Sequence, residues 1–114
     1  MHELALAQSI VEIALRTLAT QSKESRVTLV KLRIGKMTNV EPEALRYGFL
    51  AATNGTAAQG ATLLLETVPL VVFCRNCGRD FTLQEYRFSC IHCGSAQTEI
   101  HSGRELAVEY VEVE

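Results

Sequence analysis

The chain has 114 residues, of which 47% are hydrophobic and 21% charged, and its formal net charge at pH 7 is −2. This length and composition are typical of one small globular domain and argue against global disorder. The near-neutral charge gives no electrostatic reason to expect binding to nucleic acid or to an anionic membrane. The apolar runs are too short to cross a bilayer. The N-terminus lacks the pattern of a secretory signal, so we expect a cytoplasmic protein.

The first predicted element is an amphipathic helix over Leu4–Leu18. Apolar residues recur there at helical spacing, with polar residues on the opposite side. A polar loop at residues 20–25 ends this helix. Apolar and charged side chains then alternate in part from Arg26 to Ile34, which indicates a half-buried strand that stops at Gly35. The helix residues expected to face the core are Leu4, Ala7, Val11, Ala14 or Leu15, and Leu18.

A second helix is predicted over the segment VEPEALRYGFLAAT, residues 40–53. Pro42 suits the first helical position, where its missing N–H costs nothing. Glu41 and Glu43 are expected in the first turn, where negative charge suits the helix dipole. The helix is expected to stop at Asn54-Gly55. Its inner stripe is expected to consist of Leu45, Phe49 and Ala52.

Three further strands are expected downstream. Two lie within Ala61–Phe73, on either side of Pro69, which cannot donate to a central ladder. The third covers Glu105–Glu114, where the alternation changes phase near Tyr110, so we expect either a β-bulge there or a strand buried on both faces. The predicted fold class is α+β, with two helices on a small mixed sheet and an inserted module. The expected divisions are an α/β domain at residues 1–70, completed by the strand 103–114, and a module at residues 71–100.

The inserted module carries two Cys-x-x-Cys units, with twelve residues between them. Each unit brings two thiolates to one side of a tight turn, and the glycine after it supplies a permissive backbone. Two such turns facing each other place four sulfurs in a tetrahedron, the geometry of structural zinc. The spacer is long enough for a hairpin. The expected zinc ligands are Cys74, Cys77, Cys90 and Cys93, and the expected hairpin residues are Phe81, Leu83, Tyr86 and Phe88.

Other uses of the four cysteines stay open at this point, namely two disulfides, an iron site or a redox dithiol. A closed site of four thiolates leaves no position for substrate, so we do not expect catalysis at the metal. The alternative function is a zinc ribbon that binds nucleic acid, or a protein-interaction adaptor. Nucleic-acid binders carry an excess of positive charge. In residues 71–100 the charges cancel, with Arg75, Arg79 and Arg87 against Asp80, Glu85 and Glu99.

The opening Met-His-Glu favours a second metal site. The Met1 amine, the deprotonated His2 backbone nitrogen and the His2 imidazole close fused chelate rings on one metal, and such a nitrogen-rich planar set suits Ni(II) or Cu(II). The amide nitrogen or the carboxylate of Glu3 could complete it. Because an α-amino group has a pKa of about 8, metal binding should weaken as the pH falls. His92 and His101 are interpreted as exposed residues of the module, with an extra nickel ligand as the alternative for His92.

Four segments resemble the HypA/HybF family of nickel metallochaperones for hydrogenase maturation. They are the opening MHELALAQSI, GKMTNVEPEAL at residues 35–45, the paired Cys-x-x-Cys module and the closing GRELAVEYVEVE. Thr38-Asn39 departs from the small residue and glycine more common in the family. The resemblance implies that His2 is a nickel ligand and that the four cysteines hold structural zinc. The residues show no nucleophile–base arrangement and no phosphate-binding glycine loop, so we do not expect an enzyme. The resemblance also implies delivery of Ni(II) to the large subunit of [NiFe]-hydrogenase with the GTPase HypB, and some members also supply urease.

Overall fold

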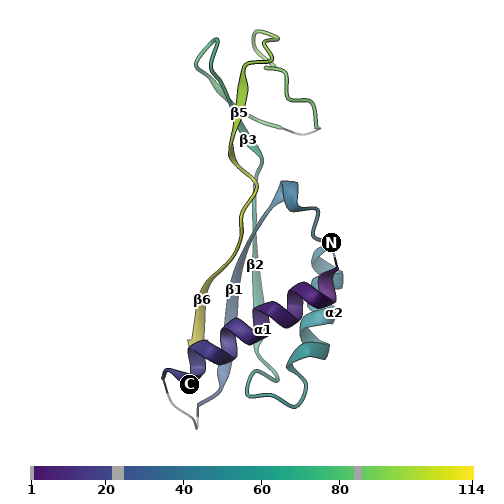
Figure 1. Ribbon diagram of the computed structural model, residues 1–114, viewed down its shortest axis with the longest axis vertical. Coiled ribbons are helices and arrows are strands. Elements are labelled where there is room, and N and C mark those ends of the chain that lie inside the picture. The colour runs from purple at the N-terminus through teal and green to yellow at the C-terminus, as the bar shows by residue number, and fades with distance from the viewer. Residues whose placement is uncertain (1, 22–24, 84–85) are drawn as a thin grey trace. The chain divides into compact units, whose positions relative to one another are not determined.

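The computed structural model describes residues 2–21, 25–83 and 86–114. The chain divides into two compact units (Figure 1). The first unit is formed by segments that precede and follow the second unit in sequence. Its segments are Met1–Arg33, Asn39–Glu66 and Ala107–Glu114, and those of the second unit are Ile34–Thr38 and Thr67–Leu106.

The first helix, α1 (Glu3–Ala19), confirms the amphipathic pattern. The expected inward position of Leu4 is wrong, because this residue is 51% exposed. Side chains on a helix tilt toward its N-terminus, so a leucine in the first turn extends beyond the core that the later turns cover. The side chains that α1 buries are Ala7, Ile10, Val11, Ala14 and Leu18.

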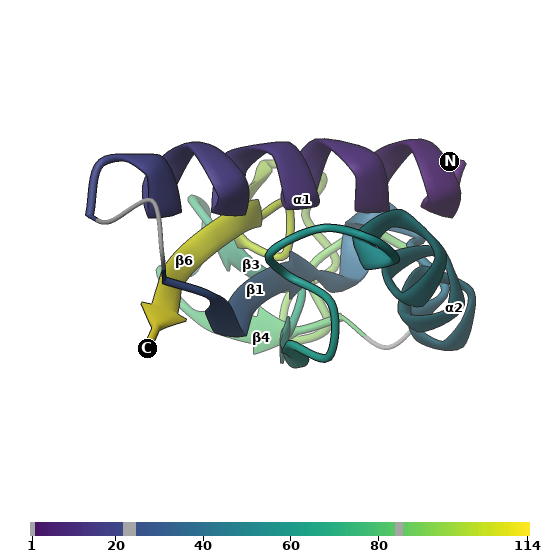
Figure 2. The same ribbon diagram turned by 90° about the horizontal axis from the view of Figure 1, so that it is seen from below.

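A three-stranded sheet in the order β2-β1-β6 forms the rest of the first unit's scaffold. Its strands are β1 (Val27–Gly35), β2 (Thr62–Val68) and β6 (Leu106–Val113). β2 runs in the same direction as β1 (Figure 1). A helix, α2 (Pro42–Thr53), lies between them in the chain and provides the crossover that a parallel pair requires. α1 lies across one face of the sheet (Figure 2). β1 supplies the buried residues Val27, Val30 and Leu32.

β6 is an edge strand and runs antiparallel to β1, so the expected mixed sheet is confirmed. Glu114 N donates to Arg26 O, and at the other end of the pair Gly35 N donates to Glu105 O. The half-buried residues of β6 are Val108 and Val111, which are three positions apart. Side chains that are three positions apart in a regular strand point to opposite faces, so this spacing confirms the change of phase. The alternative of a strand buried on both faces is wrong. The side chains of β6 are exposed or half-buried, and none is fully buried.

The second helix, α2 (Pro42–Thr53), begins with Pro42 at its first position, as predicted. Glu41 is the N-cap rather than part of the first turn, and its carboxylate accepts a hydrogen bond from Ala44 N at 2.8 Å. Just before it, Asn39 has a φ of 57°. Among residues with a side chain, asparagine tolerates this left-handed conformation well. Of the predicted inner stripe, Leu45 and Phe49 are buried and Ala52 is half-buried.

The second unit contains a separate antiparallel sheet in the order β4-β3-β5. Its strands are β3 (Val71–Cys74), β4 (Asp80–Thr82) and β5 (Thr98–Ser102). The predicted strands around Pro69 are therefore confirmed as β2 and β3. The predicted hairpin within the spacer is wrong, because β4 pairs with β3, and residues 83 and 86–89 form no strand. The core of the second unit takes up Phe81 and Leu83 from the spacer, whereas Tyr86 is exposed. This core consists of Leu70, Val72, Cys74, Phe81, Leu83 and Cys90.

Two glycines of the second unit bring backbone segments into direct contact. Met37 N donates to Gly103 O at 2.8 Å. A Cβ atom added to Gly35 would overlap Gly103 O and would lie 2.6 Å from the backbone nitrogen of Glu105. Gly103 itself has a φ of +113°, and a Cβ there would lie 2.7 Å from Leu70 Cα. Gly35 is therefore required for reasons of space, and Gly103 for reasons of both space and conformation.

On the sheet of the first unit, Lys31 lies between carboxylates from both neighbouring strands. Its ammonium nitrogen is 3.1 Å from Glu66 Oε1 and 3.4 Å from Glu109 Oε2, and its side chain is only 15% exposed. The hydrogen bond from Lys31 is the main reason that the pKa of Glu66 lies below its ordinary value of 4.5. A carboxylate with a lowered pKa adds stability above that ordinary value, and this stability is lost as the pH falls through the folded-state pKa.

We expect Lys31→Met to reduce the acid sensitivity of folding. The wild-type chain loses the Lys31–Glu66 interaction between pH 7 and pH 3, whereas the variant has none to lose. Urea unfolding at both pH values measures the change in the free energy of unfolding for each protein. Lys36→Met removes the same charge from an exposed position and serves as the control. An equal effect of pH on wild type and Lys31→Met would contradict the prediction.

Candidate metal centre

The two Cys-x-x-Cys units fold into equivalent tight turns, here called the first knuckle (Cys74–Gly78) and the second knuckle (Cys90–Gly94). Gly78 N donates to Cys74 O at 2.8 Å, and Gly94 N donates to Cys90 O at 2.9 Å. The two glycines have φ values of 74° and 77°. Only glycine adopts this conformation without steric cost, so each glycine allows the chain to turn directly after the second cysteine. Each knuckle thereby presents two sulfurs on one side.

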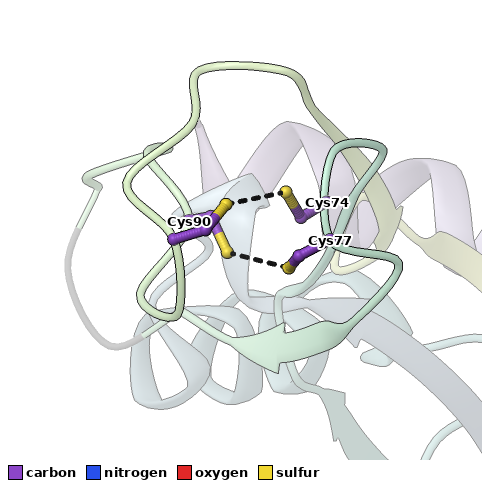
Figure 3. A group of neighbouring side chains, drawn as sticks. Cys74, Cys77 and Cys90 are labelled. Atoms are coloured by element: carbon purple, nitrogen blue, oxygen red, sulfur yellow. Dashed lines mark hydrogen bonds between the residues drawn. The ribbon is translucent and has the colours of Figure 1, made fainter.

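The four sulfur atoms converge, and all lie within 4.8 Å of one another. Cys74 Sγ is 3.7 Å from Cys93 Sγ. Cys77 Sγ is 3.6 Å from Cys90 Sγ (Figure 3). Four sulfurs at about 2.3 Å from a zinc ion form a tetrahedron with edges of about 3.8 Å. All four cysteines are free thiols. Their donor set and spacing therefore fit zinc, and no other group of three or more potential ligands occurs among the described residues.

The four thiols differ in their surroundings. Cys74 and Cys90 are buried, Cys77 is half-buried and Cys93 is exposed. A hydrogen bond from Asn76 Nδ2, at 3.5 Å, is the main cause that lowers the pKa of Cys93 to about 6. Burial raises the pKa of Cys77 to about 11. Cys93 is therefore the more readily ionised of these two thiols, and a metal must displace a proton from Cys77 at neutral pH.

Asn76 contacts the sulfur cluster, and the sequence did not predict this contact. It lies in the first knuckle and its side chain reaches a sulfur of the second, 17 positions away in the chain. The only signal in the sequence was an amide side chain inside a Cys-x-x-Cys unit. Ligand spacing predicts which residues bind the metal, but it says nothing about which neighbours donate hydrogen bonds to them.

The two histidines of the second unit make contacts with aromatic rings. His92 is exposed, its backbone nitrogen donates to Cys90 Sγ at 3.3 Å, and its ring meets Phe81 edge-on at 6.2 Å. His101 stacks on Phe73 with ring centroids 5.0 Å apart, and its Nε2 atom is 3.2 Å from Glu99 Oε1. His101 is exposed as predicted, and it lies on β5.

At the start of the chain, His2 is the N-cap of α1 and is exposed. Its carbonyl accepts from Leu6 N, but its side chain makes no capping hydrogen bond. The next residue, Glu3, accepts a hydrogen bond from Glu41 N at 3.3 Å, and this bond is the main cause that lowers the pKa of Glu3. Met1 lies outside the described residues. The His2 side chain is thus exposed to solvent and does not cap the start of the helix.

The fold and the sulfur cluster define a small α+β metal-binding protein with a zinc-ribbon module. Residues 1–113 match the family model described as "Hydrogenase/urease nickel incorporation, metallochaperone, hypA". The chain belongs to this HypA family, as its resemblance in sequence predicts. A metallochaperone is a carrier of metal and not an enzyme, and this favours the carrier over the nucleic-acid or adaptor alternative.

Individual relatives agree with the family model. The chain is 40% identical to the hydrogenase maturation factor HypA of Acidithiobacillus ferrooxidans (strain ATCC 53993 / BNL-5-31), over all of both chains. It is 42% identical to that of Roseiflexus sp. (strain RS-1), over all of this chain and 93% of the relative. The solution structure of the Ni metallochaperone HypA from Helicobacter pylori has a TM-score of 0.64 at 17% identity, covering 98% of this chain and 97% of the other. At that identity the comparison shows a shared fold.

Within the described part of the chain, no helix combines the length and the hydropathy needed to cross a membrane.

Proposed function

We propose that this chain binds Ni(II) at its N-terminus through His2 and delivers it during maturation of [NiFe]-hydrogenase. The observation that carries the proposal is the exposed His2 imidazole, which makes no capping hydrogen bond, in a chain of a nickel-incorporation family. A carrier must present its ligands to an acceptor, so an accessible site suits transfer. The Met1 amine and the His2 nitrogens supply a donor set that suits Ni(II).

The proposal includes a structural zinc site that takes no part in nickel transfer. Its ligands are Cys74, Cys77, Cys90 and Cys93. Thiolates select zinc, whereas imidazole and amine nitrogens also suit nickel, so ligand type separates the two metals. When bound, zinc supplies a fixed cross-link between the two knuckles. The residues of the chain contribute the four thiolates, and Asn76 donates a hydrogen bond to one of them.

We further propose that nickel transfer takes place in the cytoplasm, with a HypB-type GTPase and the hydrogenase large subunit as partners. The family description includes both hydrogenase and urease, so urease maturation proteins are the alternative recipients. Purification of the tagged chain from nickel-fed cells, followed by identification of bound proteins, distinguishes the two. Recovery of urease maturation proteins without hydrogenase proteins would contradict the hydrogenase assignment.

We expect His2→Ala to abolish specific Ni(II) binding while zinc content stays unchanged. The two sites share no ligand, and replacing an exposed residue at a helix start should change the free energy of unfolding by only a few tenths of a kcal/mol. Calorimetric titration with Ni(II) and elemental analysis measure the two properties. His101→Ala removes a histidine from the second unit and serves as the control. Unchanged nickel affinity in His2→Ala would disprove the proposed site.

A second form of the protein tests the amine. A few residues added before Met1 convert the free amine into an amide and remove one nitrogen donor, while every side chain stays in place. We expect weaker Ni(II) binding in this form, because His2 alone retains fewer donors. If the extension leaves affinity unchanged while His2→Ala lowers it, side chains hold the metal without the amine.

A further inference from the structure

The second cysteines of the two knuckles occupy equivalent positions but differ in access to solvent. Cys77 and Cys93 each precede the glycine that turns the chain. Cys77 is half-buried and packs against the core of the second unit, whereas Cys93 is exposed. The first cysteines, Cys74 and Cys90, are both buried. Cys93 is therefore the sulfur that a reagent from solvent can approach, and Cys77 is an internal control with the same local turn.

The exposed sulfur is held by a donor from the opposite knuckle. Asn76 Nδ2 lies 3.5 Å from Cys93 Sγ. At the equivalent position of the second knuckle stands His92, whose ring instead lies edge-on to Phe81. A hydrogen bond to a thiolate withdraws electron density from the sulfur and makes it a weaker nucleophile. The knuckles thus place an amide donor at the accessible ligand.

We propose that Cys93 is the site at which a hydroperoxide modifies the metal centre, and that Asn76 is a positioning residue that slows this reaction. The inference rests on the zinc assignment proposed above and is independent of nickel delivery. Its chemistry requires an oxidant of one class, a hydroperoxide, and a second thiolate near the first. Cys74 Sγ, 3.7 Å from Cys93 Sγ, supplies that thiolate.

The reaction has two balanced steps. First, the Cys93 thiolate attacks one peroxide oxygen, so an S–O bond forms, the O–O bond breaks and hydroxide leaves. The attacked oxygen keeps its hydrogen, so Cys93 becomes a neutral sulfenic acid, and the peroxide is reduced by two electrons. Second, the Cys74 thiolate attacks the Cys93 sulfur, so an S–S bond forms, the S–O bond breaks and a second hydroxide leaves. Two of the four ligands are then tied in a disulfide, and release of zinc reports the reaction.

The test uses the full chain loaded with zinc, whose zinc content is measured first. Less than one equivalent of hydrogen peroxide is added, and zinc release is followed with 4-(2-pyridylazo)resorcinol. Samples quenched early are alkylated and mapped by peptide mass spectrometry. We expect the first modification at Cys93 and the first disulfide between Cys93 and Cys74. First modification at Cys77, or equal modification of all four cysteines, would overturn the inference.

Variants test the part played by Asn76. We expect Asn76→Ala to release zinc at least about threefold faster, because a hydrogen bond to a charged acceptor is lost. Asn76→Ser, which restores a donor, should return part of the protection. Ile91→Ala, at a 67% exposed position of the second knuckle, serves as the control. Release at the wild-type rate in Asn76→Ala overturns the role of Asn76.

The experiment distinguishes failure of the zinc assignment from failure of the assignment of Cys93. A chain purified without zinc contradicts the zinc assignment in the proposed function. A chain that holds zinc but is modified elsewhere first contradicts only the present inference. If Asn76→Ala fails to hold zinc, the order of modification in the wild-type chain still decides the site, and Asn76→Ser against Ile91→Ala decides the role of Asn76.

Discussion

Replacing Cys74 with alanine is expected to abolish stoichiometric zinc binding and to unfold the second unit. Cys74 is 0% exposed and belongs both to the sulfur cluster and to the core around Val72. Zinc binding in small cysteine modules contributes about 10–16 kcal/mol, and this binding energy is folding energy. Loss of one thiolate from a closed set of four therefore removes more stabilising free energy than the apolar core of the second unit can supply.

The measurement combines elemental analysis with two-dimensional NMR. Wild type should contain about one zinc per chain, and the variant close to none. Amide signals from residues 67–106 should collapse, whereas those of α1 and α2 should stay dispersed, because the first unit has its own buried residues. Val72→Ala is the matched control, since it removes a buried side chain at about 2–3 kcal/mol without touching a ligand. Full zinc content in Cys74→Ala would refute the assignment.

The second large effect is expected for Gly35→Ala, which should lower the free energy of unfolding by more than about 3 kcal/mol. A Cβ atom at this position overlaps Gly103 O and approaches the backbone nitrogen of Glu105 to 2.6 Å. Both are backbone atoms, so no side chain can rotate to relieve the overlap. The added methyl group must instead separate the two segments and break the hydrogen bond from Gly35 N to Glu105 O.

Urea unfolding of Gly35→Ala and of Gly55→Ala separates this steric effect from backbone strain. Gly55 has a φ of +77°, but a Cβ atom there would meet nothing within 4 Å. Its replacement should therefore cost only the strain of a left-handed alanine, about 1 kcal/mol. Similar losses of stability in the two variants would show that the segments at Gly35 can separate without cost.

Local patterns in the sequence predict the elements and the metal ligands because those signals lie close together in the chain. The apolar spacing of α1, Pro42 at the start of α2 and the two Cys-x-x-Cys units each occupy a few consecutive turns. Physical chemistry links such spacing directly to structure, through helical periodicity for the helices and tetrahedral coordination for zinc. The placement of nickel at His2 stays a prediction that binding experiments must decide.

Pairings between distant segments were not predictable in the same way. The spacer residues Phe81 and Leu83 have the composition of a hairpin, yet a strand formed earlier in the chain, β3, supplies the partner. Asn76 reaches a sulfur across the two knuckles, and Gly35 meets Gly103 across the second unit. Neither contact produces a periodic pattern in the sequence, because each depends on how separate turns are brought together in space.

The position of β6 in the chain has a consequence for biosynthesis. β1 needs β6 to cover one of its edges, but β6 is translated only after residues 69–105, which takes about 2–7 s at ordinary elongation rates. During that interval β1 shows a row of unpaired backbone groups beside apolar residues such as Val30, the kind of edge that recruits strands from other nascent chains. Neighbouring ribosomes on one message hold such chains close together. The insertion therefore lengthens the time for which β1 of a newly made chain has one unpaired edge.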